Sequence, residues 1–132
     1  MGQVAEVKVQ KYLNRGGCQY SQSQGKNKDF DLFCLLHGER VEVKRDMKAP
    51  ITGNLCFEKA LAATKSETVV YVIGTKAYLF KTAQLWPALI GLQKEGLTRF
   101  VFGGDRNANP LLIVKMDDIL PFATEINLEE IA

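Results

Sequence analysis

The stretch from Asp29 to Lys44, DFDLFCLLHGERVEVK, predicts a β-hairpin around which the rest of the chain is organised. Apolar and polar residues alternate on both sides of His37-Gly38, which we expect to form the turn. With a two-residue loop, Asp31 lies opposite Lys44, and Glu42 is a diagonal neighbour of Asp31, roughly 5–8 Å away at Cβ. Opposed residues of an antiparallel pair point to the same face, so these three side chains share one face.

Asp31, Glu42 and Lys44 allow two interpretations. Two carboxylates and an ammonium on one rigid patch of sheet are typical of a metal-dependent hydrolytic site. A solvated outer face with a cross-strand ion pair would produce the same pattern, and the spacing alone does not decide between them. Asp29 is two residues before Asp31 and would point to the same face of the strand, but it lies two residues further from Glu42. Asp31 is therefore the preferred site acid. The other face must be buried, and its residues are Leu32, Cys34, Val41 and Val43.

The composition is that of a globular protein. At 132 residues, we expect one domain, residues 1–132, with a substantial core. Hydrophobic residues make up 46% and charged residues 24% of the chain, which excludes a disordered chain. The net charge of +2 does not indicate a nucleic-acid partner, so an electropositive surface must come from local clustering.

The cysteines and the hydropathy pattern predict the cellular compartment in which the protein works. Cys18, Cys34 and Cys56 are widely spaced and form no C-x-x-C pair, so we expect reduced, buried thiols in an intracellular protein. No apolar run approaches the ~18 residues of a membrane span, and the N-terminus carries no signal-peptide core. The sequence therefore predicts a cytoplasmic protein with no membrane partner.

A helix is expected from Gly2 to Asn14, ending before a Gly-Gly pair. Glu6 lies at the border of its apolar stripe. A carboxylate there is usually a surface charge, and the alternative is that Glu6 leans over the sheet edge toward the face of Asp31 and Glu42. The stripe itself consists of Ala5, Val9, Tyr12 and Leu13.

The rest of the chain predicts an α/β fold in which helices cover both faces of a central mixed sheet. The run Thr68–Gly74 has no polar alternation and indicates a central strand covered on both faces. Thr82 is the expected N-cap of a helix through about Gln93. Its expected buried side is Leu85, Trp86, Leu89, Ile90 and Leu92. Further strands are expected at 18–21, 76–80, 98–102 and 111–115, with a strand-to-helix passage or a short helix near 55–63 and a short helical turn at 119–121.

The spacing of Asp31, a hairpin and then Glu42-Val43-Lys44, inside an α–β–β–β–α–β order, resembles the PD-(D/E)XK nuclease superfamily. Its restriction-endonuclease-like core is shared with archaeal-type Holliday junction resolvases and small phage-encoded nucleases. The segment TGNLCFE, Thr52 to Glu58, is similar to a phage-type subgroup. The resemblance covers about Val4 to Phe80 and assigns nothing beyond it. Phe30 stands where the family usually has a proline.

The resemblance implies a DNA endonuclease in a bacterial or phage-infected cytosol. Asp31 and Glu42 would be metal ligands, with the backbone carbonyl of Val43 as a further ligand and Glu6 in support. Hard oxygen ligands suit Mg²⁺, for which Mn²⁺ is expected to substitute. Lys44 would be the catalytic lysine, and beside two carboxylates it is favoured in its charged form, which argues for orienting water and neutralising charge.

Polar residues around the hairpin are the expected DNA contacts, although each alone is usually plain surface charge. They are Lys26, Lys28, Arg45, Lys48, Asn54 and Lys65. Glu58 is a weaker metal-site candidate, and His37 is more simply a turn residue.

Three hypotheses for function remain open at this stage. The first is the endonuclease, for which a junction-resolving variant requires a homodimer because two symmetric cuts need two sites. The second is a catalytically inert DNA-binding or assembly module with the same fold. The third is a structural protein whose charged hairpin is only a solvated face.

Overall fold

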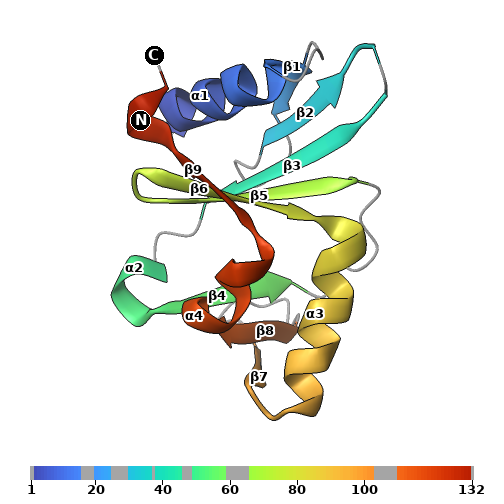
Figure 1. The fold of residues 1–132 in the computed structure, drawn as a ribbon, viewed down its shortest axis with the longest axis vertical. Helices are drawn as coiled ribbons and strands as arrows, with labels where there is room; N and C mark the ends of the chain where they lie inside the picture. The colour runs from blue at the N-terminus through green and yellow to red at the C-terminus, as the bar shows by residue number, and fades with distance from the viewer. Residues whose placement is uncertain are drawn as a thin grey trace.

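A large mixed sheet runs through the centre of the molecule (Figure 1). The structure is a computed structural model, and it describes residues 2–15, 20–24, 30–36, 38–45, 49–58, 66–102 and 110–131. Its strands are β1 (Tyr20–Gln24), β2 (Phe30–Cys34), β3 (Arg40–Arg45), β5 (Thr68–Ile73), β6 (Lys76–Lys81) and β9 (Thr124–Asn127). They lie in the order β1-β2-β3-β5-β6-β9. The β3–β5 pair is parallel and the other neighbours are antiparallel.

Three further strands form a small antiparallel sheet of their own. They are β4 (Asn54–Glu58), β7 (Thr98–Phe102) and β8 (Pro110–Lys115), in the order β4-β8-β7. The helices of the described residues are α1 (Gly2–Asn14), α2 (Ala49–Thr52), α3 (Thr82–Lys94) and α4 (Met116–Ile119), with 3-10 turns η3 (Leu120–Phe122) and η4 (Leu128–Glu130). The mixed α/β class and the helix at Gly2–Asn14 are confirmed.

The β2–β3 hairpin forms with a register that differs from the predicted one. Asp31 lies opposite Glu42, not opposite Lys44. The cause is a longer connection between the strands, because the Cys34 amide donates to the Glu39 carbonyl (2.8 Å) and the Gly38 amide donates to the Cys34 carbonyl (2.9 Å). A shift of two residues preserves which side chains share a face, since the side-chain period of a strand is two.

One face of the large sheet is covered by α1 (Figure 1). The core on this side, here called the upper core, is built from the alternate residues that the sequence placed on the apolar face of the hairpin. Tyr12 and Leu13 of α1 pack against it. Its buried members are Val9, Tyr20, Leu32, Cys34, Val41, Val43, Val70, Val72, Ala77, Ile126, Leu128 and Ile131.

The opposite face is covered by the small sheet together with α3 (Figure 1). The prediction of one central sheet is therefore incomplete, because the strands expected at 98–102 and 111–115 pair with β4 in a separate sheet. Along β4 and β8, buried residues alternate with less buried ones, so the small sheet buries one of its faces. This lower core consists of Ala49, Leu55, Phe57, Val69, Tyr71, Ile73, Tyr78, Phe80, Leu85, Leu89, Leu92, Leu112, Val114 and Ile119.

The strand β5 confirms the prediction made from its continuous apolar run. All six of its residues are buried, because alternate side chains enter the upper core and the lower core. It pairs with β3 on one side and with β6 on the other. Because β3 pairs with β5, which is covered on both faces, β3 also lies between the upper core and the lower core.

The helix α3 differs from its prediction at two positions. The N-cap residue is Lys81, and Thr82 is the first helical residue, whose hydroxyl donates to the Ser66 carbonyl (2.8 Å). Ile90 was expected on the buried side but is 49% exposed. The buried positions Leu85, Leu89 and Leu92 follow a 4-3 spacing that leaves Ile90 on the flank of the stripe.

Cys34 is disulfide-bonded, whereas Cys56 is a free thiol. The prediction of reduced thiols is therefore wrong for Cys34. Its burial was predicted from strand alternation, but disulfide pairing depends on a Cα separation and a side-chain direction that only the folded chain provides. Within the described part of the chain, no helix is long and apolar enough to cross a membrane.

Phe57 joins the two sheets. Its ring lies edge-on to the rings of Tyr71 (5.1 Å between centroids) and Phe80 (6.2 Å) in the large sheet. Tyr71 and Phe80 are also edge-on to each other, at 6.1 Å. Edge-to-face packing of this kind adds about 0.5–1.5 kcal/mol per pair to the effect of burial alone.

We predict that Phe57→Ala lowers the free energy of unfolding by about 3–5 kcal/mol, because it leaves a cavity between the sheets. Phe100, on the edge strand β7, is 55% exposed and provides the matched control. Phe100→Ala should change stability by less than about 0.5 kcal/mol. Urea denaturation of both variants measures the difference, and equal losses would contradict the assigned role of Phe57.

Candidate active site

Glu42 and Lys44 lie on β3, on the face of the large sheet that the small sheet covers. In the parallel register Glu42 neighbours Val69, and Lys44 neighbours Tyr71, both of which belong to the lower core. The Lys44 ammonium lies 3.2 Å from Oε2 of Glu42, and the two side chains are only 15% and 20% exposed. A charged pair this far removed from water is expensive to bury unless each partner compensates the other, so the two groups hold each other in place.

The backbone of Asp31 lies directly opposite Glu42 in the β2–β3 register. Directly opposed residues have Cβ atoms about 4.5–5.5 Å apart, which is closer than the diagonal placement expected from the sequence. The exact position of the Asp31 carboxylate lies outside what the structure describes. The register nevertheless places two carboxylate-bearing residues and one lysine on one patch.

Val43, whose backbone carbonyl was expected to be a further metal ligand, does not lie at a sheet edge. It is on β3, between β2 and β5, and its side chain is buried in the upper core. Glu6 belongs to α1, which covers the face opposite to Glu42 and Lys44 (Figure 1). The positions of the Glu6 and Glu58 side chains lie outside the description, so their proposed roles stay predictions.

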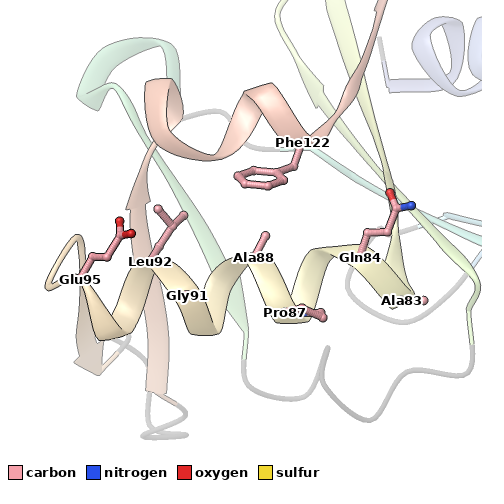
Figure 2. Close-up of a pocket in the computed structure, with 8 residues that line it drawn as sticks. All are labelled: Ala83, Gln84, Pro87, Ala88, Gly91, Leu92, Glu95 and Phe122. Carbon is pink, nitrogen blue, oxygen red and sulfur yellow. The ribbon is translucent and has the colours of Figure 1, made fainter.

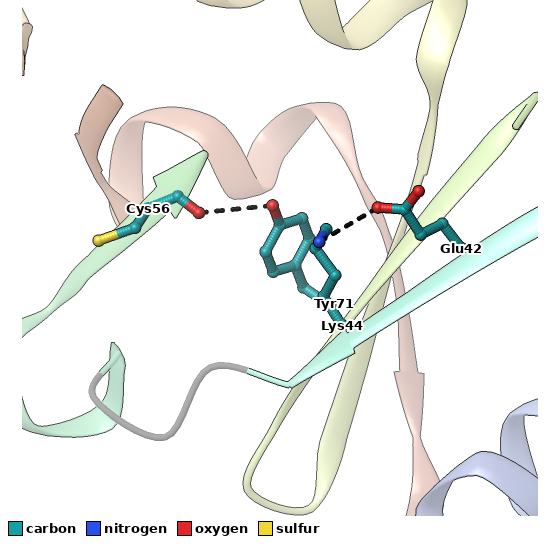
Figure 3. A network of polar contacts seen from close by, with 4 residues as sticks. All are labelled: Glu42, Lys44, Cys56 and Tyr71. Atoms are coloured by element: carbon teal, nitrogen blue, oxygen red, sulfur yellow. Dashed lines mark hydrogen bonds and ion pairs between the residues drawn. The ribbon is translucent and has the colours of Figure 1, made fainter. Parts of the chain in front are cut away.

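Tyr71 connects the charged pair to the small sheet. Figure 3 shows Lys44 beside the Tyr71 ring, whose hydroxyl donates to the backbone carbonyl of Cys56 on β4 at 3.4 Å. The same ring packs edge-on against Phe57. The charged pair therefore lies where the apolar core between the sheets gives way to solvent.

The Thr52-Gly53-Asn54 segment forms a tight turn that starts β4. The Asn54 amide donates to the Thr52 hydroxyl (3.2 Å), and the Gly53 amide donates to the Ala49 carbonyl (2.8 Å). The Gly53 carbonyl accepts from the amide of Met116 (2.9 Å), which connects the turn to α4. Gly53 has φ +74°, in the left-handed region that favours glycine.

Of the six predicted DNA contacts, only Asn54 has a described side chain, and it is half-buried at the start of β4. Arg45 ends β3, and its side chain is not described. Lys26, Lys28, Lys48 and Lys65 lie outside the described residues.

Sequence reasoning missed Tyr71 as a neighbour of the charged pair. Its position inside an apolar run indicated only a core residue. The relation to Lys44 depends on the parallel β3–β5 register, which joins segments separated by more than twenty residues. No local signal in the sequence carries that register.

A groove lies away from the charged pair. Figure 2 shows a groove between α3 and η3, about 660 Å³ in volume. Small and apolar residues dominate its lining, together with Gln84, and Phe122 lies across from the helix. Glu95 is the one charged residue among those that line it, so the groove offers no acid–base or metal-binding set.

Comparisons with known proteins add no relative. The sequence matches no protein-family model, and no similar protein is found among curated proteins or solved structures. The geometry around Glu42 and Lys44 is therefore the basis for assigning a function.

We predict that Gly53→Ala lowers stability by about 1–2 kcal/mol, the cost of a left-handed conformation for a residue with a Cβ. No atom lies within 4 Å of a Cβ added at Gly53 or at Gly91, so neither substitution causes a clash. Gly91→Ala, inside α3, should instead stabilise the protein by about 0.5–1 kcal/mol. Thermal denaturation followed by circular dichroism measures both, and a loss at both sites would contradict the backbone explanation.

Proposed function

We propose that this protein is a metal-dependent DNA endonuclease with a restriction-endonuclease-like core. The observation that carries the proposal is the β2–β3–β5 register. It puts Asp31 directly opposite Glu42, with Lys44 two residues further on the same face. That is the D…E-x-K arrangement of the PD-(D/E)XK superfamily.

The topology supports the same proposal. The chain runs α1-β1-β2-β3 and then places β5 parallel to β3, in agreement with the element order that the resemblance implies. The position of the second core helix is occupied in part by the short α2, followed by β4, and residues 59–65 lie outside the description. We place the activity in the cytoplasm of a bacterial or phage-infected cell, where DNA is the available substrate.

The residues on this face fit a magnesium ion. Carboxylate oxygens from Asp31 and Glu42, with a backbone carbonyl such as that of Val43, are the hard donors that Mg²⁺ prefers. The ion would supply charge stabilisation at the phosphate oxygens and a water that loses a proton readily. Mn²⁺ offers similar chemistry at the same donors.

Lys44 has the position of a group that orients water and neutralises charge. Its ammonium is held by Glu42 at 3.2 Å, and its stem lies beside Tyr71 (Figure 3). Such fixed placement is what electrostatic catalysis requires, because no reorganisation is needed when negative charge develops on the phosphate. We assign Lys44 this role rather than that of a free base.

A catalytically inert DNA-binding module of the same fold is the alternative function. Against it stands the complete set of Asp31, Glu42 and Lys44, since loss of catalysis usually removes at least one such residue. Junction resolution by a homodimer is a narrower form of the main proposal, and substrate preference in cleavage assays decides it.

We predict that Lys44→Met abolishes Mg²⁺-dependent cleavage, with at least a 100-fold loss of rate, because it removes the charge and keeps an apolar stem. Lys76→Met is the matched control. Lys76 also pairs with a carboxylate, that of Glu125 at 3.5 Å, but it lies on β6, away from the candidate site. The cleavage activity of Lys76→Met should therefore equal that of the wild type.

The assay uses plasmid, linear duplex, single strand and a four-way junction, with Mg²⁺, Mn²⁺ or EDTA. Cleavage that survives Lys44→Met would contradict the assigned role of Lys44. Intact DNA binding without cleavage of any substrate by the wild type would favour the inert module.

We predict that Glu42→Gln and Asp31→Asn each abolish stoichiometric Mn²⁺ binding, because each removes a charged oxygen ligand. Isothermal titration calorimetry in the absence of DNA measures this directly. Glu125→Gln, at the exposed pair with Lys76, should leave Mn²⁺ binding unchanged. Unaltered binding in Glu42→Gln would place the metal elsewhere.

A further inference from the structure

A second cleft lies on the outer face of the small sheet. Its volume is about 390 Å³, and its lining includes Asn54, Arg99, Lys115 and Asp118. None of these residues except Asn54 belongs to the part of the chain that the nuclease resemblance covers. The C-terminal third therefore contributes most of the cleft.

The register of the small sheet explains why these side chains converge. Lys115 on β8 lies opposite Asn54 on β4. Arg99 on β7 lies opposite Ile113, which is two residues before Lys115 and so shares its face. The other face of the same strands is buried in the lower core, so this face points outward.

The cleft carries a net positive charge. Arg99 and Lys115 are both exposed cations, and Asp118, at the start of α4, is the single carboxylate among the lining residues. Within the described part of the chain, neither Arg99 nor Lys115 forms an ion pair, in contrast to Lys44 and Lys76. Two cations against one carboxylate, beside the side chain of Asn54, form a site suited to an anion.

The strand β4 connects the cleft to the candidate active site. Asn54 lines the cleft, and two residues later the Cys56 carbonyl accepts the hydroxyl of Tyr71, the neighbour of Lys44. Two residues of β-strand span about 7 Å. A polyanion bound at the active site would extend beyond it, and β4 leads from there to the cleft.

We propose that this cleft binds a backbone phosphate of the DNA substrate, beside the bond that is cut. The proposal rests on the nuclease function proposed above and extends the DNA contact to the small sheet. Arg99 and Lys115 neutralise the phosphate, and Asn54 donates a hydrogen bond to it. Contacts of this kind position the duplex and carry no sequence preference.

The first test removes the two cations and keeps their stems. Arg99→Gln/Lys115→Gln should raise the Kd for duplex DNA roughly 10-fold, and by the same factor for unrelated sequences. The slope of log K against log salt should fall in magnitude by about 1, since the cleft holds one phosphate and each phosphate contact contributes about 0.9. Fluorescence anisotropy in EDTA, which prevents cleavage, measures both quantities.

Lys8→Gln/Lys81→Gln is the matched control, because it removes the same charge at α1 and at the end of β6, away from the small sheet. It should leave affinity and salt slope within twofold of the wild type. An equal loss in the control would show a non-specific charge effect and would overturn the cleft assignment.

The second test predicts a gain. Asp118→Asn removes the carboxylate from the cleft and should tighten DNA binding about 3-fold through reduced repulsion. Asp117→Asn, the adjacent acidic residue that does not line the cleft, should have a smaller effect. Equal effects of the two substitutions would overturn the proposal.

The two proposals fail in different ways. If the wild type cleaves DNA with Mg²⁺ while Arg99→Gln/Lys115→Gln matches it in affinity and salt slope, only the cleft assignment falls. If the wild type neither cleaves nor binds any DNA, the nuclease function itself falls, and the cleft loses its proposed ligand with it.

Discussion

The contact between the two sheets is the constraint on which the candidate site depends. Phe57 of the small sheet packs edge-on against Tyr71 and Phe80 of the large sheet, and all three rings are almost completely buried. Tyr71 is also the register neighbour of Lys44. The same packing that stabilises the fold therefore limits the space in which the Lys44 side chain can move.

The candidate site around Glu42 and Lys44 is partly buried. Glu42 and Lys44 lie at the boundary between the lower core and solvent, with side chains that are only 20% and 15% exposed. Electrostatic interactions are stronger in such a place than in open solvent, and an unpaired charge there is costly. A solvated outer face, one of the interpretations of the charged hairpin, does not describe side chains that are covered to this extent.

The small sheet contributes to packing with one face and presents cations on the other. Its inner face closes the lower core through Leu55, Phe57 and Leu112, and its outer face carries Arg99 and Lys115. The alternation of a strand separates these two tasks, because successive side chains point in opposite directions. One element can therefore cover the core and present cations beside the site.

The sequence by itself determined the strand alternation, the buried run of β5, the α1 helix and the shared face of Asp31, Glu42 and Lys44, because each follows from local periodicity. It did not determine the hairpin register, which depends on a loop closed by Cys34 and Glu39. Only the tertiary structure decided that β4, β7 and β8 form a separate sheet, that Tyr71 adjoins Lys44, and that Asn54 and Lys115 meet. Those contacts join segments far apart in the chain, and their formation depends on which apolar faces can bury one another.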